Sequence, residues 1–159
     1  AVGLEMFRAD YQGELDRWVN GELTENEFVP FYLRNWGFDW QLYADIFRFS
    51  RDNKLPMIGL NVPRRVTRQV ARSGFSSLRE EQFKEIPPVA CDVDKGYQDF
   101  IRRAMGAPGK GGLKFQYFCE AQLVWDSAMA WYSLTFLKKN PESILVILNF
   151  PEVSEVGVD

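Results

Sequence analysis

Three short apolar runs in this chain are separated by longer stretches in which apolar residues recur with a helical period. The apolar runs, at residues 2–7, 56–60 and 143–149, are flanked by polar sequence and predict buried strands. The longer stretches predict helices. The order strand, helices, strand, helices, strand is typical of an α/β fold with a mostly parallel sheet flanked by helices.

Helical periodicity and capping residues mark the segments between the strands. Thr24 and Glu27 have the spacing of a capping box, and one apolar face of the third helix carries Leu42, Ile46 and Phe49. A Gly/Pro loop at 106–112 contains no Gly-Lys-Ser or Gly-Lys-Thr, so a nucleotide-binding P-loop is not predicted. The predicted helices cover residues 10–19, 25–33, 38–53, 63–73, 80–84, 97–105 and 113–139.

Three strands make a thin parallel sheet, because parallel strands need cover on both faces and neighbours on both edges. We therefore expect a sheet that lacks an edge or first strand, with a position beside the first strand that is vacant or filled by another chain. The length of 159 residues fits one domain, 1–159, which we expect to be incomplete at both ends.

Composition limits the function classes. Hydrophobic residues make up 46% of the chain, which suits a packed core, and the net charge of -3 gives no broad case for binding nucleic acid or an anionic membrane. Arg64, Arg65, Arg68 and Arg72 are a local exception, for which a solvated helix face is the usual explanation. No apolar run is long enough to span a bilayer.

Histidine is absent, which removes the commonest general base and the commonest haem and metal ligand. Two cysteines, Cys91 and Cys119, do not form a disulfide framework. They could pair or stay reduced, and a buried thiol is the commoner outcome for Cys119 in its apolar helical run.

Polar residues near the predicted ends of two strands are the first candidates for a ligand site. Glu5 stands near the end of the first strand, and Asn61 and Arg64 follow the second. Open α/β sheets bind ligands beyond the carboxyl ends of their strands. A carboxylate that caps a loop, or a structural ion pair between Glu5 and Arg64, would explain the same residues without a ligand. An arginine beside a pocket also suits a carboxylate or propionate.

Gln122 and Asp126 are four residues apart and share a helix face with apolar residues expected in the core. Polar groups on such a face must be paired or must line a cavity. A closed hydrogen-bond network is the alternative to a ligand site. A second aromatic group lies between the first two strands and favours an ordinary core over a flat cofactor surface. It comprises Trp18, Tyr32, Trp36, Trp40 and Tyr43.

Four segments in order and spacing resemble the ChaN-like haem-binding uptake family of the Tiki superfamily. They are Gly3-Leu4-Glu5-Met6-Phe7, then Gly21-Glu22-Leu23-Thr24 with Glu27-Phe28, then Asn61-Val62-Pro63-Arg64, and finally Ala121-Gln122-Leu123-Val124-Trp125-Asp126 with Met129-Ala130. The resemblance implies a pocket lined by Glu5, Asn61, Arg64, Gln122 and Asp126, with haem as the small-molecule ligand and no metal site in this chain.

The resemblance also implies a haem- or iron-uptake binding protein on the periplasmic side of the bacterial envelope, lipid-anchored in its full-length form, with a homodimer left open. The alternative is a metal-dependent, esterase- or peptidase-like hydrolase of the wider superfamily. The family's histidine motifs, expected just before Ala1 and after the last strand, are missing: that strand runs into Asn149-Phe150-Pro151-Glu152. This absence counts against metal-dependent catalysis and leaves Tyr, Cys or Met as axial haem ligands.

Overall fold

A computed structural model describes residues 1–89, 92–104 and 113–149 of the chain. The chain forms two compact units. Unit 1 comprises residues 1–60 and 136–159, and unit 2 comprises residues 61–135. Cys91, the Gly/Pro loop at 106–112 and the segment after Asn149 lie outside the described residues, so the expectations placed on them stay untested.

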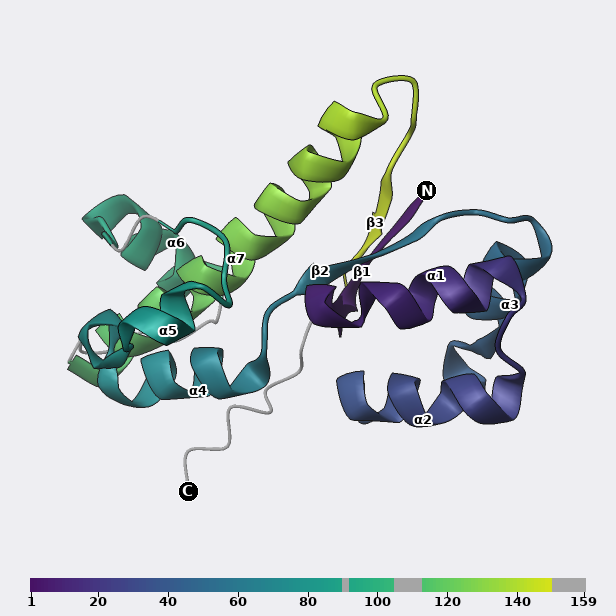
Figure 1. The fold of residues 1–159 in the computed structure, drawn as a ribbon. Helices are drawn as coiled ribbons and strands as arrows, with labels where there is room; N and C mark the ends of the chain where they lie inside the picture. The colour runs from purple at the N-terminus through teal and green to yellow at the C-terminus, as the bar shows by residue number, and fades with distance from the viewer. Residues whose placement is uncertain (90–91, 105–112, 150–159) are drawn as a thin grey trace. The chain divides into compact units, whose positions relative to one another are not determined.

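Unit 1 is built on a three-stranded parallel sheet, as the sequence predicts. Its strands are β1 (Val2–Arg8), β2 (Met57–Asn61) and β3 (Val146–Leu148), in the order β2-β1-β3 (Figure 1). The register pairs Val2 with Val146 and Leu4 with Leu148. Strand β1 is buried on both faces along most of its length, which fits a central strand of a parallel sheet.

The central place of β1 corrects one expectation. Both edges of β1 are occupied, so the vacant position predicted beside the first strand does not exist; the outer edges of the sheet belong to β2 and β3. Helix α1 (Gln12–Asn20) closes part of the β2 edge. The Gln12 side chain accepts a hydrogen bond from Gly59 N (3.0 Å) and donates one to Met57 O (2.8 Å).

Gly59 is needed where β2 passes the end of β1. A Cβ at this position would lie 2.5 Å from the backbone oxygen of Arg8, a distance that no side chain tolerates. The end of β1 is also tied to helix α2 (Glu25–Asn35), because Arg8 N donates to Asn35 Oδ1 at 3.1 Å. These contacts fix the strand ends with groups of the same unit.

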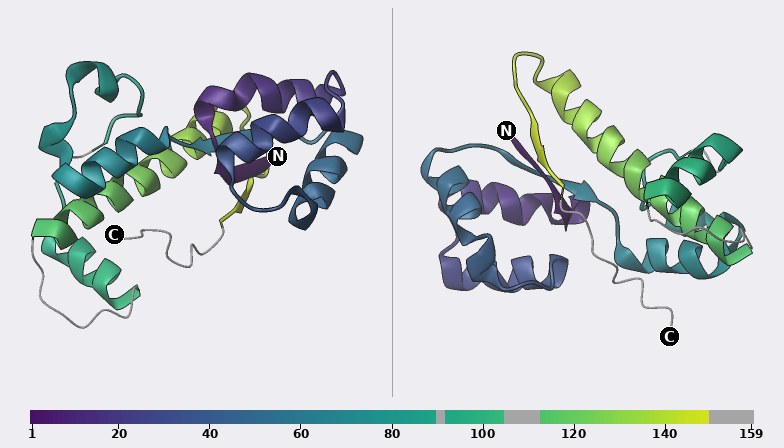
Figure 2. Two further views of the ribbon diagram at one scale, coloured as in Figure 1. Left: turned by 90° about the horizontal axis from the view of Figure 1, so that it is seen from below. Right: turned by 180° about the vertical axis from the view of Figure 1, so that it is seen from behind.

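The helices of unit 1 follow the predicted caps. A 3-10 turn η1 (Ala9–Tyr11) precedes α1, and Gly21 ends α1 in the left-handed conformation at φ 79°. The capping box of α2 is confirmed, with Thr24 N donating to Glu27 Oε2 at 2.8 Å. The segment predicted as one helix at 38–53 is divided into η2 (Trp40–Leu42) and α3 (Ala44–Asp52). Helices α1 and α2 lie side by side (Figures 1 and 2).

The apolar face predicted for α3 is wrong in phase. Leu42 and Phe49 are 68% and 60% exposed, whereas Ala44, Phe47 and Ser50 are buried. The reason is the aromatic cluster: the Phe47 ring lies 5.5 Å from Phe28, and this contact sets the rotation of the helix. Sequence periodicity identified an amphipathic helix here but chose the wrong one of two apolar faces.

Unit 2 is helical. Helix α7 (Leu113–Lys139), whose predicted bounds are confirmed, contributes residues up to Thr135, and a shorter helix packs its apolar side against it. This helix, α4 (Arg64–Ser73), buries Val66 and Val70 in one cluster with Val124 and Ala128 of α7. The unit also contains η3 (Phe75–Ser77), α5 (Glu80–Phe83) and α6 (Lys95–Ala104), of which the last two are labelled in Figure 1.

Candidate functional site

Glu5 belongs to unit 1 and lies in the middle of β1. The strand continues to Arg8, so Glu5 stands three residues before its carboxyl end, and the predicted position at the strand end is wrong. Its side chain is buried, with the residue 6% exposed. A buried carboxylate in a central strand is costly unless it is satisfied by polar partners, and Glu5 does have an interaction partner.

Asn61 and Arg64 belong to unit 2, whose first residue is also the last residue of strand β2. Asn61 is the last residue of β2, as predicted, and its Oδ1 accepts a hydrogen bond from Val62 N at 2.8 Å. Arg64 is the first residue of α4 and is exposed. The Asn61 side chain therefore orders the turn between them. Arg64 begins the helix that follows this turn.

Gln122 and Asp126 lie one turn apart on α7, but they do not both face the core. Asp126 is exposed and Gln122 is half-buried. The most buried positions of α7 are Cys119, Glu120, Ala121, Val124, Ala128 and Ser133. The core-facing stripe predicted from Phe115, Phe118, Met129 and Phe136 is therefore rotated from the real one, and those four residues are half-buried.

The side chain that meets Asp126 is Tyr97 of α6. The Tyr97 hydroxyl donates a hydrogen bond of 2.7 Å to Asp126 Oδ2, across 29 residues of sequence. Tyr97 is half-buried, and burial, together with the hydrogen bond and the negative charge of Asp126, raises the pKa of its phenol well above the ordinary value. The pair is thus a neutral phenol held by an exposed carboxylate.

Other aromatic and charged groups stand on the same two helices, and of these the Phe100 ring lies 6.5 Å from the Tyr97 ring. Arg102 of α6 lies over the Phe115 ring at 4.8 Å and donates to Asp99 at 3.0 Å. Phe100, one turn from Tyr97, is 56% exposed. We call Tyr97, Phe100, Arg102, Phe115 and Asp126 the α6–α7 cluster. It combines an oxygen donor, an exposed aromatic ring and a guanidinium within one unit.

Cys119 is buried on α7, as the sequence predicts, and among the described residues it forms no disulfide. Burial raises the pKa of its thiol, although the positive charge of Arg102 acts in the opposite direction. The Cys119 side chain also has no exposed surface through which a ligand could reach it. The Tyr97 hydroxyl, whose hydrogen bond to Asp126 lies at an exposed position, is therefore the more accessible donor of the two.

Sequence reasoning missed Tyr97 and also Glu120, a buried carboxylate of α7. Glu120 Oε2 accepts from Phe75 N at 2.7 Å, and its Oε1 accepts from Gln116 Nε2 at 3.0 Å. Gly74, at φ 75°, leaves room for these side chains, since a Cβ there would lie 2.5 Å from the Tyr117 ring and 3.0 Å from Glu120 Oε2. Glu120 closes the start of η3 and acts as a structural group. A carboxylate four residues after Gln116 on an apolar helix was the available signal.

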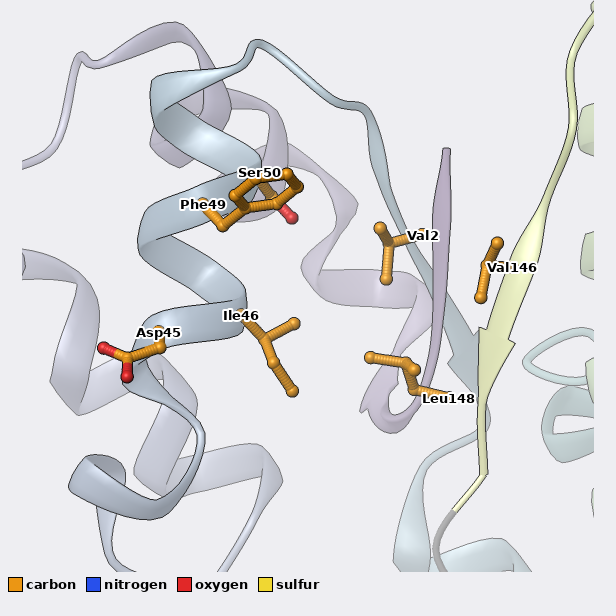
Figure 3. A pocket seen from close by; sticks show the side chains of 7 residues that line it. All are labelled: Val2, Asp45, Ile46, Phe49, Ser50, Val146 and Leu148. Atoms are coloured by element: carbon orange, nitrogen blue, oxygen red, sulfur yellow. The ribbon is translucent and has the colours of Figure 1, made fainter.

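Unit 1 contains an open apolar groove of about 390 Å³ between α3 and the sheet (Figure 3). Ile46 and Phe49 of α3 point toward Val2, Val146 and Leu148 of β1 and β3, whereas Asp45 points away. The groove contains none of the predicted site residues. The aromatic group of this unit is an ordinary core, with Trp18 and Tyr32 fully buried and Trp36 and Trp40 nearly so.

The described ranges contain no group of three or more acidic or cysteine side chains arranged to hold a metal ion. They also contain no helix with the length and apolar character needed to cross a membrane. The structure thus places Gln122 and Asp126 on neighbouring turns of α7 in unit 2, and Asn61 and Arg64 at the start of that unit. The convergence of all five predicted residues in one pocket stays a prediction.

Comparison with known proteins agrees with the resemblance carried by the sequence motifs. No curated protein and no solved structure gives a significant match. A family model described as haem-binding uptake, Tiki superfamily, ChaN, matches residues 1–149. The match covers both units, including the β1 segment and the Gln122–Asp126 segment of α7. The chain therefore belongs to the ChaN haem-binding uptake family of the Tiki superfamily.

Proposed function

We propose that this chain is a haem-binding protein of bacterial iron uptake and that Tyr97 is its axial ligand. The observation that supports this proposal is the hydrogen bond of 2.7 Å between the Tyr97 hydroxyl and Asp126, in a chain of the haem-binding uptake family that has no histidine. Haem iron is held in proteins by His, Cys, Met or Tyr. The absence of histidine leaves the last three.

The residues of the α6–α7 cluster fit a haem group. Haem has an iron that can take an anionic oxygen ligand. It also has a flat apolar ring and two carboxylates. Tyr97 offers the oxygen, the exposed ring of Phe100 offers apolar contact, and Arg102 is the type of side chain that binds a propionate. Cys119 fits less well, because its side chain is fully buried.

Asp126 has a distinct role in this proposal. Its Oδ2 holds the hydroxyl hydrogen of Tyr97 and so fixes the direction of the phenol oxygen. The pKa of Tyr97 lies above its usual value in the free chain, so the phenol keeps its proton until a positive charge arrives beside the oxygen. Haem binding through Tyr97 should therefore release a proton and strengthen as pH rises.

The test is a titration with hemin, followed by absorbance, on the wild-type chain and on Tyr97→Phe. We expect wild type to shift the main hemin band with a 1:1 endpoint. Tyr97→Phe should weaken binding by at least about tenfold, roughly the 1.4 kcal/mol of one lost interaction. Asp126→Ala should fall between the two. Melting temperatures close to wild type would show that the fold is spared.

Tyr11→Phe is the matched control, because Tyr11 is a half-buried tyrosine of unit 1 that lies under Arg8. Its hemin affinity should equal that of wild type. Unchanged binding in Tyr97→Phe would reject Tyr97 as the ligand. A wild-type chain without any hemin-induced shift would reject the haem function altogether.

The place of action that we propose is the bacterial cell envelope, on its periplasmic side and with a lipid anchor in the full-length protein. Membership of an uptake family supports this proposal. Fractionation of cells that express the full-length gene, with detection of the protein in the envelope fraction, is the direct test. Recovery in the cytoplasmic fraction would contradict the proposed location.

A further inference from the structure

Helix α4 carries a stripe of arginines on one side. Arg64, Arg65, Arg68 and Arg72 are all exposed. At 100° and 1.5 Å per residue, the four lie within an arc of about 100° and along about 12 Å of helix axis. We call these four residues the arginine face.

The opposite side of α4 is occupied by the core of unit 2. Val66 and Val70 are fully buried and pack in one cluster with Val124 and Ala128 of α7. Because the apolar side of the helix is already used, the arginine face is directed outward. Any partner of this face would be held by charge, with little apolar contact.

Two of the four arginines of this face have no ion-pair partner among the residues that the structure describes, whereas Arg64 and Arg65 each have an interaction partner. Helix α4 has no acidic residue; Arg65 pairs with Glu85, whereas Arg68 and Arg72 form no ion pair with any described residue. Arginines at positions i and i+4 of a helix repel one another. A sequence that keeps like charges in this arrangement loses some helix stability, which an anionic partner would offset.

We propose that the arginine face docks on a surface of anionic phospholipid headgroups. Clusters of four or more basic residues on an amphipathic helix suit such a surface, and each arginine adds to the attraction. Duplex nucleic acid suits this chain less well. Its phosphates extend far beyond one 12 Å stripe, whereas the rest of the chain is acidic enough to bring the total charge to -3.

The proposal is tested with the full chain by co-sedimentation with vesicles that contain phosphatidylglycerol, against vesicles of phosphatidylcholine alone. We expect wild type to bind only the anionic vesicles at about 50 mM salt, and to be released as salt shortens the Debye length. A triple variant, Arg65→Gln with Arg68→Gln and Arg72→Gln, should lose roughly 100-fold in vesicle affinity.

The matched control removes three positive charges from unit 1 instead. Arg34, Lys138 and Lys139 are exposed, and Arg34→Gln with Lys138→Gln and Lys139→Gln should bind the vesicles within about twofold of wild type. An equal loss in this control, or no wild-type binding to anionic vesicles, would overturn the proposal. So would tighter wild-type binding to a duplex oligonucleotide than to the vesicles. Hemin binding by the arginine variant should be unchanged, which separates this inference from the haem proposal.

Discussion

The two units of the chain differ in charge and in how they use it. Unit 1 has eight basic and fourteen acidic residues, for a net charge of -6, whereas unit 2 has eleven basic and eight acidic residues, for a net charge of +3. Their cores differ as well. Unit 1 is centred on stacked and edge-on aromatic rings, and unit 2 on small aliphatic residues of α4 and α7.

This difference separates stability from binding. In unit 1, charges are held in local contacts: Arg48 binds Glu25, Arg51 lies over the Trp18 ring at 4.3 Å, and Lys54 donates to the last carbonyls of α1. In unit 2, the Tyr97–Asp126 pair and the arginine face stand at accessible positions. We therefore expect unit 1 variants to change folding and unit 2 surface variants to change binding.

The largest expected effect is the loss of an aromatic ring from unit 1. Phe28 is fully buried, its ring stacks 4.5 Å from Trp18, and it lies 5.5 Å from Phe47. Phe28→Ala should lower the free energy of unfolding by about 3–5 kcal/mol, measured by urea titration. Val66→Ala removes only two carbons from the core of unit 2 and should cost about 2 kcal/mol. A loss below about 1 kcal/mol for Phe28→Ala would contradict the central place of this ring in the core of unit 1.

How far the sequence predicts this fold depends on the kind of signal. The strands, their parallel arrangement and the 27 residues of α7 follow from apolar runs and from long periodicity, which tertiary contacts do not override. The phase of α3 does not follow, because Phe47 and Phe49 are both apolar and only the contact with Phe28 selects between them. The central position of β1 in the sheet was not predicted either, because the order of strands is set by tertiary contacts.

The candidate site shows the same limit. The positions of Asn61 at a strand end and of Asp126 on a long helix follow from local signals. Tyr97 was not identified, because its link to Asp126 spans 29 residues and two helices, and no local pattern encodes that distance. Glu5 was identified as a polar residue in an apolar run, but its depth in β1 depends on where the strand ends. The sequence thus indicates which polar residues are candidates, but it does not indicate which residues they contact in the fold.

A smaller effect is expected at the buried carboxylate of unit 2. Glu120→Ala would leave Phe75 N without its acceptor in a buried position, which should cost about 1–3 kcal/mol in the free energy of unfolding. Glu120→Gln keeps an oxygen acceptor and should recover most of that loss. If Glu120 instead bound ligand, both variants would weaken hemin binding while leaving urea stability unchanged, and our structural assignment would be wrong.

The smallest expected effect is a pH-dependent one in unit 1. Glu25 Oε1 and Oε2 accept hydrogen bonds from Arg48 at 2.6 and 2.8 Å, and Trp40 Nε1 donates to Oε1 at 2.9 Å. These contacts, that from Arg48 first, lower the pKa of Glu25 from 4.5 to about 2. A carboxyl with a lowered pKa in the folded state binds its proton more readily when unfolded. Its contribution to stability is therefore present above pH 4.5 and is lost as pH falls toward 2.

The size of this contribution is limited because both side chains are partly exposed, Glu25 by 33% and Arg48 by 37%. Solvent screening should leave on the order of 1 kcal/mol for Glu25. Urea unfolding of wild type and Glu25→Gln should thus differ by about that amount at pH 7, and the difference should shrink as pH falls from 4.5 toward 2. Glu22→Gln, which removes a carboxylate 3.8 Å from Arg17, serves as the control. A difference for Glu25→Gln that stays constant across this range would mean that the charge of Glu25 does not stabilise unit 1. The hydrogen bond from Trp40 would then account for the difference in the free energy of unfolding.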